Sequence, residues 1–161
     1  MWPGDVEYRR ETVQSGEFSS SSVRMSLHTG THMDAPRHRF EEGKPIHRFQ
    51  PFIVSALVNI EGSCDGKAVI RNGPLTPEEA QRLVSGGVVL VGTASASIDH
   101  SGGVKAHEVI LGAGIPVIEN LALHGITPGE YILMAFPLKF KDADGSPVRV
   151  LLADSIHDLK P

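Results

Sequence analysis

The segment between residues 28 and 38 constrains this chain more than any other feature. It reads His-Thr-Gly-Thr-His-Met-Asp-Ala-Pro-Arg-His, so three of the eight histidines of the chain lie close to one aspartate. Imidazole and carboxylate groups bind zinc and manganese, and a further histidine can move a proton near neutral pH. The alternative is an exposed loop that happens to be rich in histidine. The added aspartate, glycine and threonines favour a metal site.

The spacing of His28, His32 and Asp34 predicts a bent backbone. Gly30, two β-branched threonines and the nearby Pro36 disfavour a helix here. On a straight strand, residues four apart are separated by about 13 Å, too far for two side chains that each bind one ion at about 2 Å. Glycine accepts the backbone angles of a tight turn. We therefore expect a strand that ends in a glycine-centred loop, which turns both imidazoles and the carboxylate toward one point.

His38 has a different position in the same segment. It lies beyond Pro36, which redirects the chain, so it can lie near the metal without binding it. A histidine beside a metal-bound water is well placed to act as general base and acid. The alternative is a surface histidine in the basic run from Arg37 to Arg39. Spacing alone leaves both interpretations open.

The composition predicts one soluble globular domain spanning residues 1–161. Hydrophobic residues make up 40% of the chain and charged residues 21%, which is ordinary for such domains. A formal net charge of −4 without a basic stripe argues against nucleic acid as a partner. No apolar run is long enough for a membrane span, and no signal segment is visible, so no membrane partner is expected. The single Cys64 excludes a multi-thiolate zinc site and an internal disulfide, so a cytoplasmic protein is expected.

Short elements with more strand than helix are expected, because glycines and prolines divide the chain. One helix should begin at Thr76, which can form a capping box with Glu79, and should end at Gly86 and Gly87. A second short helical stretch precedes Gly112. Strands are expected at residues 23–27, 52–60, 88–91, 117–118, 131–136 and 148–152, the last two joined through a hairpin-type turn at 142–145.

His107 and Glu119 are the candidates for a second metal position. Glu119 follows an apolar run, where a buried charge is costly unless it is paired or bound to metal. The alternative places Glu119 at a strand end that faces water. Asp99 could support a ligand histidine or cap the next turn, and a structural role is favoured. Solvated positions are expected for the remaining histidines, which are His47, His100, His124 and His157.

The segment from His28 to His38 fits the pattern H-x-G-T-H-x-D-x-P-x-H at every fixed position. It resembles the metal-dependent cyclase-like hydrolases, which include bacterial kynurenine formamidase (arylformamidase) and isatin hydrolase. The resemblance implies a compact α/β domain with a β-barrel-like core that assembles into homodimers or homotetramers. It covers nearly the whole chain, with further similar stretches at residues 2–5, 97–99, 107–121, 137–139 and 144–149.

The resemblance also implies roles for single residues. His38 would be the catalytic acid and base, and Trp2 would line the substrate pocket. The ligands of one or two divalent ions, zinc or manganese, with Asp34 as the bridge, would be His28, His32, Asp34, His107 and Glu119.

The function that follows is hydrolysis of a small amide by a metal-activated water, with His38 as proton carrier. The substrate would be an aryl formamide such as N-formylkynurenine, or a cyclic amide. The alternatives are a non-catalytic module of the same fold that binds a metal and a small ligand, and a structural metal site in a dimer. Two departures from the family leave the substrate open. By comparison with the family, we expect the strand that normally precedes Trp2 to be absent and residues 60–76 to form a shortened version of a region that helps to shape the pocket in relatives.

Overall fold

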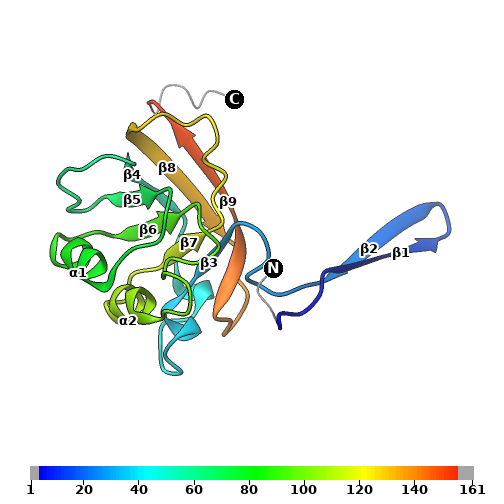
Figure 1. The fold of residues 1–161 in the computed structure, drawn as a ribbon. Helices are drawn as coiled ribbons and strands as arrows, with labels where there is room; N and C mark the ends of the chain where they lie inside the picture. The colour runs from blue at the N-terminus through cyan, green and yellow to red at the C-terminus, as the bar shows by residue number, and fades with distance from the viewer. Residues whose placement is uncertain (1–3, 156–161) are drawn as a thin grey trace.

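Within residues 4–155, which the computed structural model describes, seven strands close into a barrel (Figure 1). Their order is β3-β7-β6-β5-β4-β8-β9, and β9 pairs with β3 to complete the ring. The strands are β3 (His32–Asp34), β4 (Phe52–Val58), β5 (Ala68–Arg71), β6 (Leu90–Thr93), β7 (Val117–Glu119), β8 (Gly129–Pro137) and β9 (Gly145–Ala153).

The barrel has a parallel half and an antiparallel half. Strands β4, β5, β6 and β7 run parallel to one another, whereas β8, β9 and β3 pair in antiparallel fashion with their neighbours. Figure 1 shows α1 (Pro77–Ser85) and α2 (Lys105–Gly112) packed beside the parallel half. The helices connect β5 to β6 and β6 to β7, which is the usual way to join parallel strands.

Two apolar cores follow from the alternation of side chains along the strands. Residues such as Ala56 and Ile70 point into the barrel, where they join one buried cluster. Their neighbours Leu57 and Val69 point outward and pack against the helices in a second buried cluster. The predicted strand-rich α/β fold with a barrel core and few helices is confirmed.

Both predicted helices are present, and α1 begins where the sequence predicted, whereas α2 begins at Lys105, two residues before the expected start at His107. The Thr76 hydroxyl accepts the Glu79 amide at 3.2 Å, and the Glu79 carboxylate accepts the Thr76 amide at 2.7 Å, so the capping box is present. At the start of α2, Asp99 accepts the amides of Ala106 at 2.7 Å and His107 at 3.2 Å. Asp99 therefore satisfies two of the amides that every helix leaves unpaired at its N-terminus.

The strand predicted at residues 23–27 is correct only at Val23 and Arg24. Strand β2 ends at Arg24, and residues 25–31 form turns before the short strand β3 begins. The glycine-centred loop therefore precedes the strand of the motif and does not follow it. The reason is local, because the Thr29 amide donates to Ser26 O at 3.2 Å and Gly30 has a positive φ of 68°.

An arm of two antiparallel strands, β1 (Arg9–Ser15) and β2 (Phe18–Arg24), projects from the barrel (Figure 1). Every residue of both strands is exposed. A run of four serines at residues 19–22 lies within β2.

The connection between β4 and β5 spans only residues 59–67 and contains no helix. Parallel neighbours usually need a crossover of about a dozen residues or more. Sharp turns at Asn59 (φ 52°) and Gly66 (φ 67°) allow the shorter path. Among the described residues, no helix has the length and apolar character needed to cross a membrane.

Candidate metal centre

The register of the barrel brings His32, Asp34 and Glu119 together. Strand β3 pairs with β7 so that His32 lies directly opposite Glu119. His32 and Asp34 are two residues apart, so both side chains leave the same face of β3. Met33, between them, is fully buried in the barrel core. Closure of the barrel therefore presents these three polar side chains on its outer face, where each is less than 10% exposed.

The loop before β3 adds His28 to this group. With Gly30 in a left-handed conformation, the chain bends and His28 Nδ1 lies 2.7 Å from Asp34 Oδ1. The His32 ring donates from Nδ1 to Gly30 O at 2.9 Å, which fixes the orientation of that imidazole. The Thr31 hydroxyl donates to Asn120 O at 2.6 Å and ties the loop to the chain after β7.

Helix α2 and strand β7 supply the other two predicted ligands. The His107 Nε2 atom lies 3.2 Å from Glu119 Oε1 and 3.5 Å from Asp34 Oδ2. On its other side, His107 Nδ1 lies 2.6 Å from Asp99 Oδ2, so Asp99 both caps α2 and orients the histidine. Glu119 is only 5% exposed, so the alternative in which it faces water is wrong. Its Oε1 atom accepts the Ile98 amide at 2.6 Å.

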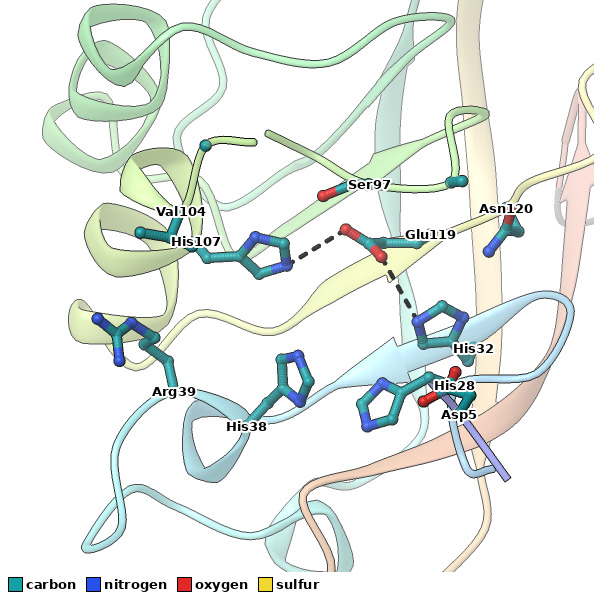
Figure 2. Close-up of a pocket in the computed structure, with 12 residues that line it drawn as sticks. Asp5, His28, His32, His38, Arg39, Ser97, Val104, His107, Glu119 and Asn120 are labelled. Carbon is teal, nitrogen blue, oxygen red and sulfur yellow. Dashed lines mark ion pairs between the residues drawn. The ribbon is translucent and has the colours of Figure 1, made fainter. Parts of the chain in front are cut away.

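The two oxygens of Asp34 face different partners. Oδ1 lies close to His28 and 3.4 Å from His32 Nε2, whereas Oδ2 faces His107. Figure 2 shows Glu119 between His107 and His32, with ion pairs to both. Two donors that each lie about 2.0–2.2 Å from one ion are about 2.8–3.6 Å apart at octahedral or tetrahedral angles. The donor spacings in this cluster fall in or near that range.

Two buried atoms in the cluster make no hydrogen bond within the described part of the chain: Asp34 Oδ2 and His107 Nε2. A buried polar atom without a partner is costly, and a carboxylate oxygen more so. A divalent cation between these two atoms would satisfy both at once. The donor set therefore fits a divalent ion. The five side chains that form this metal-ligand cluster are His28, His32, Asp34, His107 and Glu119.

The charges of the metal-ligand cluster stabilise one another. Burial lowers the pKa of His28, but hydrogen bonds with Asp144 and Asp34 outweigh burial and raise it to about 10. Burial also lowers the pKa of His107, yet its ion pairs with the Asp34 and Glu119 carboxylates raise that pKa to about 10. Burial raises the pKa of Asp34, but the nearby His107 and His28 rings outweigh burial and lower it well below its usual range. A bound cation must compete with these protons.

His38 lies at the open side of the cluster. It ends a short 3-10 helix, Pro36–His38, and its side chain is 37% exposed. Its ring centroid lies 4.2 Å from that of His28 and 5.9 Å from that of His107. His38 is thus adjacent to the ligands but more accessible than any of them, as the interpretation of a nearby proton carrier requires.

Asp144 is a site residue that the sequence did not indicate. Its Oδ2 atom lies 2.9 Å from His28 Nε2 and 3.2 Å from His38 Nδ1. In the sequence, Asp144 belongs to a turn, where aspartate is common for local reasons. Its place in the site depends on the pairing of β3 with β9, in which Asp34 lies opposite Gly145. No signal in the sequence reveals that register.

A pocket of about 320 Å³ opens over the cluster (Figure 2). Val104 provides an exposed apolar wall, while Arg39, Ser97 and Asn120 provide polar groups. Asp5, expected only as part of a turn, also lines the pocket. Two residues with predicted positions, Trp2 and His157, lie outside the described residues. The other histidines, His47, His100 and His124, do not line the pocket, and the last two are exposed.

We expect metal binding to release protons and to weaken as the pH falls. His28 and His107, with pKa values of about 10, carry protons that a cation must displace. Binding of Zn²⁺ to chelator-treated protein near neutral pH should release about two protons. Isothermal titration calorimetry in buffers of different ionisation enthalpy measures this number. A zinc affinity that is independent of pH, with no proton release, would contradict the protonated state of these two histidines. Substitution of the exposed His124 by alanine is the control and should change neither quantity.

Known proteins with similar sequences and folds agree with this geometry. Residues 1–96 match the Cyclase family. The chain is 32% identical to the kynurenine formamidase of Salinibacter ruber over 194 residues, covering 96% of this chain and 92% of the relative. It is also 32% identical to the kynurenine formamidase of Geobacillus thermodenitrificans, covering 94% and 90%. The first alignment is longer than the chain of 161 residues, in agreement with the expectation that relatives are longer.

Solved structures share the fold. Isatin hydrolase A from Labrenzia aggregata superposes with a TM-score of 0.81 at 22% identity, covering 96% of this chain and 86% of that one. A predicted metal-dependent hydrolase from Bacillus stearothermophilus gives a TM-score of 0.74 at 24% identity, covering 91% and 86%. The sequence and structure comparisons thus lead to one conclusion: the chain belongs to the Cyclase family, with kynurenine formamidases among its relatives.

Proposed function

We propose that this protein is a metal-dependent hydrolase of the arylformamidase type, which cleaves the C–N bond of a small amide. The observation that carries the proposal is the convergence of four other ligand side chains on Asp34, with His38 beside them and a pocket above. A divalent ion held there would polarise a carbonyl group and lower the pKa of a water molecule. Kinship with the kynurenine formamidases supports the same reaction class.

The metal-ligand cluster suits two cation positions that share Asp34. His28, His32 and Asp34 form one group of donors. The second ion would lie beside His107 Nε2, which is 3.5 Å from Asp34 Oδ2 and 3.2 Å from Glu119 Oε1. Imidazole and carboxylate donors accept both zinc and manganese. We propose one of these metals in each position that is filled, and elemental analysis will identify it.

His38 is proposed as the acid and base. Its ring is exposed to the pocket, so it can accept a proton from the water that attacks the carbonyl carbon. It can then deliver that proton to the leaving nitrogen, which departs as an amine. General acid and base catalysis of this kind contributes about 10²–10⁴-fold in rate.

The pocket favours a small substrate with an aromatic part and a polar part. Val104 and Ala96 offer apolar contacts for a ring. Arg39, whose guanidinium also pairs with Glu108 at 2.6 Å, lines the same pocket as a partner for a carboxylate. We propose an aryl formamide such as N-formylkynurenine first, and a cyclic amide of the isatin type second. Trp2 is proposed to contact the aromatic part. A reducing cytoplasm is proposed as the compartment, consistent with the free thiol of the buried Cys64.

Hydrolysis of a small panel of substrates tests the proposal. The metal-loaded protein should hydrolyse an N-formyl aryl amide faster than a lactam or an aryl ester. Removal of the metal by a chelator should abolish the activity, and Zn²⁺ or Mn²⁺ should restore it. Activity can be followed by the absorbance of the released arylamine. Tight metal binding with no turnover of any panel member would instead support the alternative of a binding module.

Replacement of His38 by alanine should separate proton transfer from metal binding. We expect turnover to fall about 10²–10⁴-fold while the metal content stays at the wild-type level. Elemental analysis and initial rates measure the two properties on the same preparation. Loss of metal in this variant would make His38 a ligand and refute its assignment as the proton carrier. The matched control is His124→Ala, which removes an exposed histidine away from the pocket and should retain both properties.

A homo-oligomer is proposed as the working form, with a second copy of this chain as the protein partner. The arm of residues 9–24 supports the proposal, because an isolated two-stranded hairpin is only marginally stable in water. Val13 and Phe18, which are 60% and 78% exposed, lie on one face of the arm. Both apolar side chains remain exposed within residues 4–155.

The barrel offers a matching surface. On the outside of the antiparallel half, Ile53 pairs with Met134, and Met134 pairs with Leu151, so the three form one apolar row. Ile53 and Leu151 are 57% and 40% exposed, and neighbouring Phe136 is 42% exposed. Figure 1 shows no helix over these strands. We propose that the arm of one copy lies on this row in the other, which covers both apolar surfaces in a closed two-fold dimer.

Substitution of both apolar arm residues, Val13→Ser with Phe18→Ser, should shift the protein toward the monomer. Light scattering coupled to size-exclusion chromatography measures the mass at micromolar concentration. The matched control is Val23→Ser, an equally apolar change on the opposite face of the arm, which should leave the mass unchanged. A wild-type monomer, or a double variant of unchanged mass, would rule out this arrangement.

A further inference from the structure

We propose that Asp144 is a positioning residue that orients two histidines of the site at once. It holds His28 so that Nδ1 of that ring faces Asp34, and it holds His38 so that the Nε2 atom remains free toward the pocket. The inference rests on the proposed function, since it assigns His28 to the metal and His38 to proton transfer. It adds a residue that couples the two.

The contacts of Asp144 are short and specific. One oxygen, Oδ2, lies 2.9 Å from His28 Nε2 and 3.2 Å from His38 Nδ1. The two imidazoles lie side by side, with centroids 4.2 Å apart and planes at 40°. One carboxylate oxygen can accept a hydrogen bond from each ring, so movement of Asp144 would release both histidines together.

At every histidine of the metal-ligand cluster, one ring nitrogen is held by a hydrogen bond and the other ring nitrogen faces a carboxylate. His32 has its Nδ1 held by Gly30 O, and His107 has its Nδ1 held by Asp99, which leaves Nε2 of each ring toward the carboxylates. In His28 the roles of the nitrogens are exchanged, because Nδ1 faces Asp34 and Nε2 is the atom that is held. Groups that hold the second nitrogen of a ligand histidine fix its tautomer and orientation. Asp144 occupies that place for His28.

The backbone around Asp144 is fixed, as a positioning role requires. The Ala35 amide donates to Asp144 O at 2.8 Å, directly before the β3–β9 ladder. The next residue is Gly145, and a Cβ atom there would lie only 2.8 Å from Cε1 of His28. The imidazole therefore packs against bare backbone, and the Asp144 side chain reaches its outer edge. Proximity and hydrogen bonding together define the orientation of the ring.

The contact to His38 determines which of its nitrogens can act. When Nδ1–H donates to Asp144, the neutral ring has its lone pair on Nε2, and this nitrogen can take up a proton. A ring with the opposite tautomer would present an N–H to the pocket and could not act as a base there. Asp144 thus gives His38 the tautomer that the first step of hydrolysis requires.

Asp144 could instead be a metal ligand, because donor atoms of His28, His38 and Asp144 lie within 4.8 Å of one another. The hydrogen-bond geometry favours a role for Asp144 in orienting the two histidines over a role as a metal ligand. Both rings are already directed at one Asp144 oxygen at hydrogen-bond distance, and His28 keeps its other nitrogen beside Asp34. The two roles differ in metal stoichiometry, which the experiment includes.

The experiment compares Asp144→Asn with Asp142→Asn. The control removes the same charge from the same loop at an exposed residue with a φ of 55°, where asparagine is well tolerated. Zinc affinity and stoichiometry are measured by competition with a chelator. Ring tautomers are measured by long-range ¹H–¹⁵N spectra of ¹⁵N-histidine protein loaded with zinc. Neither measurement needs a substrate, so the outcome is independent of whether an amide hydrolase activity is found.

In the wild type we expect His38 to carry its proton on Nδ1 and His28 to carry its proton on Nε2. Asp144→Asn should weaken zinc binding about 10–100-fold at unchanged stoichiometry and shift His38 toward the other tautomer. Asp144→Glu should recover part of the affinity. If a substrate is known, kcat should fall more than KM rises.

Three results would overturn the inference. The first is a wild-type spectrum in which His38 Nδ1 carries no proton. This result would refute the proposed hydrogen bond from His38 to Asp144 even if no variant folds. The second is zinc affinity and tautomers in Asp144→Asn that equal those of Asp142→Asn. The third is loss of one equivalent of zinc in Asp144→Asn, which would make Asp144 a ligand.

Discussion

The buried carboxylate of Asp34 is the interaction on which the site and the nearby barrel depend. The residue is fully buried, and an isolated carboxylate in such surroundings would be strongly destabilising. Burial of the ionised Asp34 carboxylate requires positively charged side chains on several sides of it. His28 approaches from the preceding loop, His32 from the same strand and His107 from helix α2. The fold can bury Asp34 only when all of these segments have reached their native positions.

Strand β3 makes this convergence possible although it has only three residues. It pairs with β7 on one side and β9 on the other, and thereby closes the barrel. Pairing with β7 sets Glu119 opposite His32, and pairing with β9 sets Gly145 opposite Asp34. The same hydrogen bonds that complete the barrel thus assemble the ligands. A slip of one residue in either ladder would turn the polar side chains of β3 into the barrel core.

The sequence predicts the local part of this arrangement well. The capping box at Thr76 and the bend at Gly30 depend on neighbouring residues, and both are present. The order of loop and strand in the motif was wrong, because the strand of the motif, β3, forms only through its long-range pairing with β7 and β9. Positions that depend on barrel closure are different. Asp144 looks like an ordinary turn residue in the sequence, and only the pairing of β3 with β9 brings it beside His28 and His38. For His107 and Glu119, family resemblance supplied what spacing could not.

His38 differs from the other three histidines of the site in the carboxylate that it contacts. His28, His32 and His107 each contact Asp34 or Glu119, so a change in their protonation alters the forces that hold the buried carboxylates. His38 has its carboxylate contact at Asp144, toward the surface, and its ring is 37% exposed. His38 forms its ion pair with Asp144, so proton transfer at His38 leaves in place the ion pairs that hold the buried carboxylates of Asp34 and Glu119. The charge of His38 still acts on Asp34 through space, and the Asp144 oxygen that it contacts also holds His28.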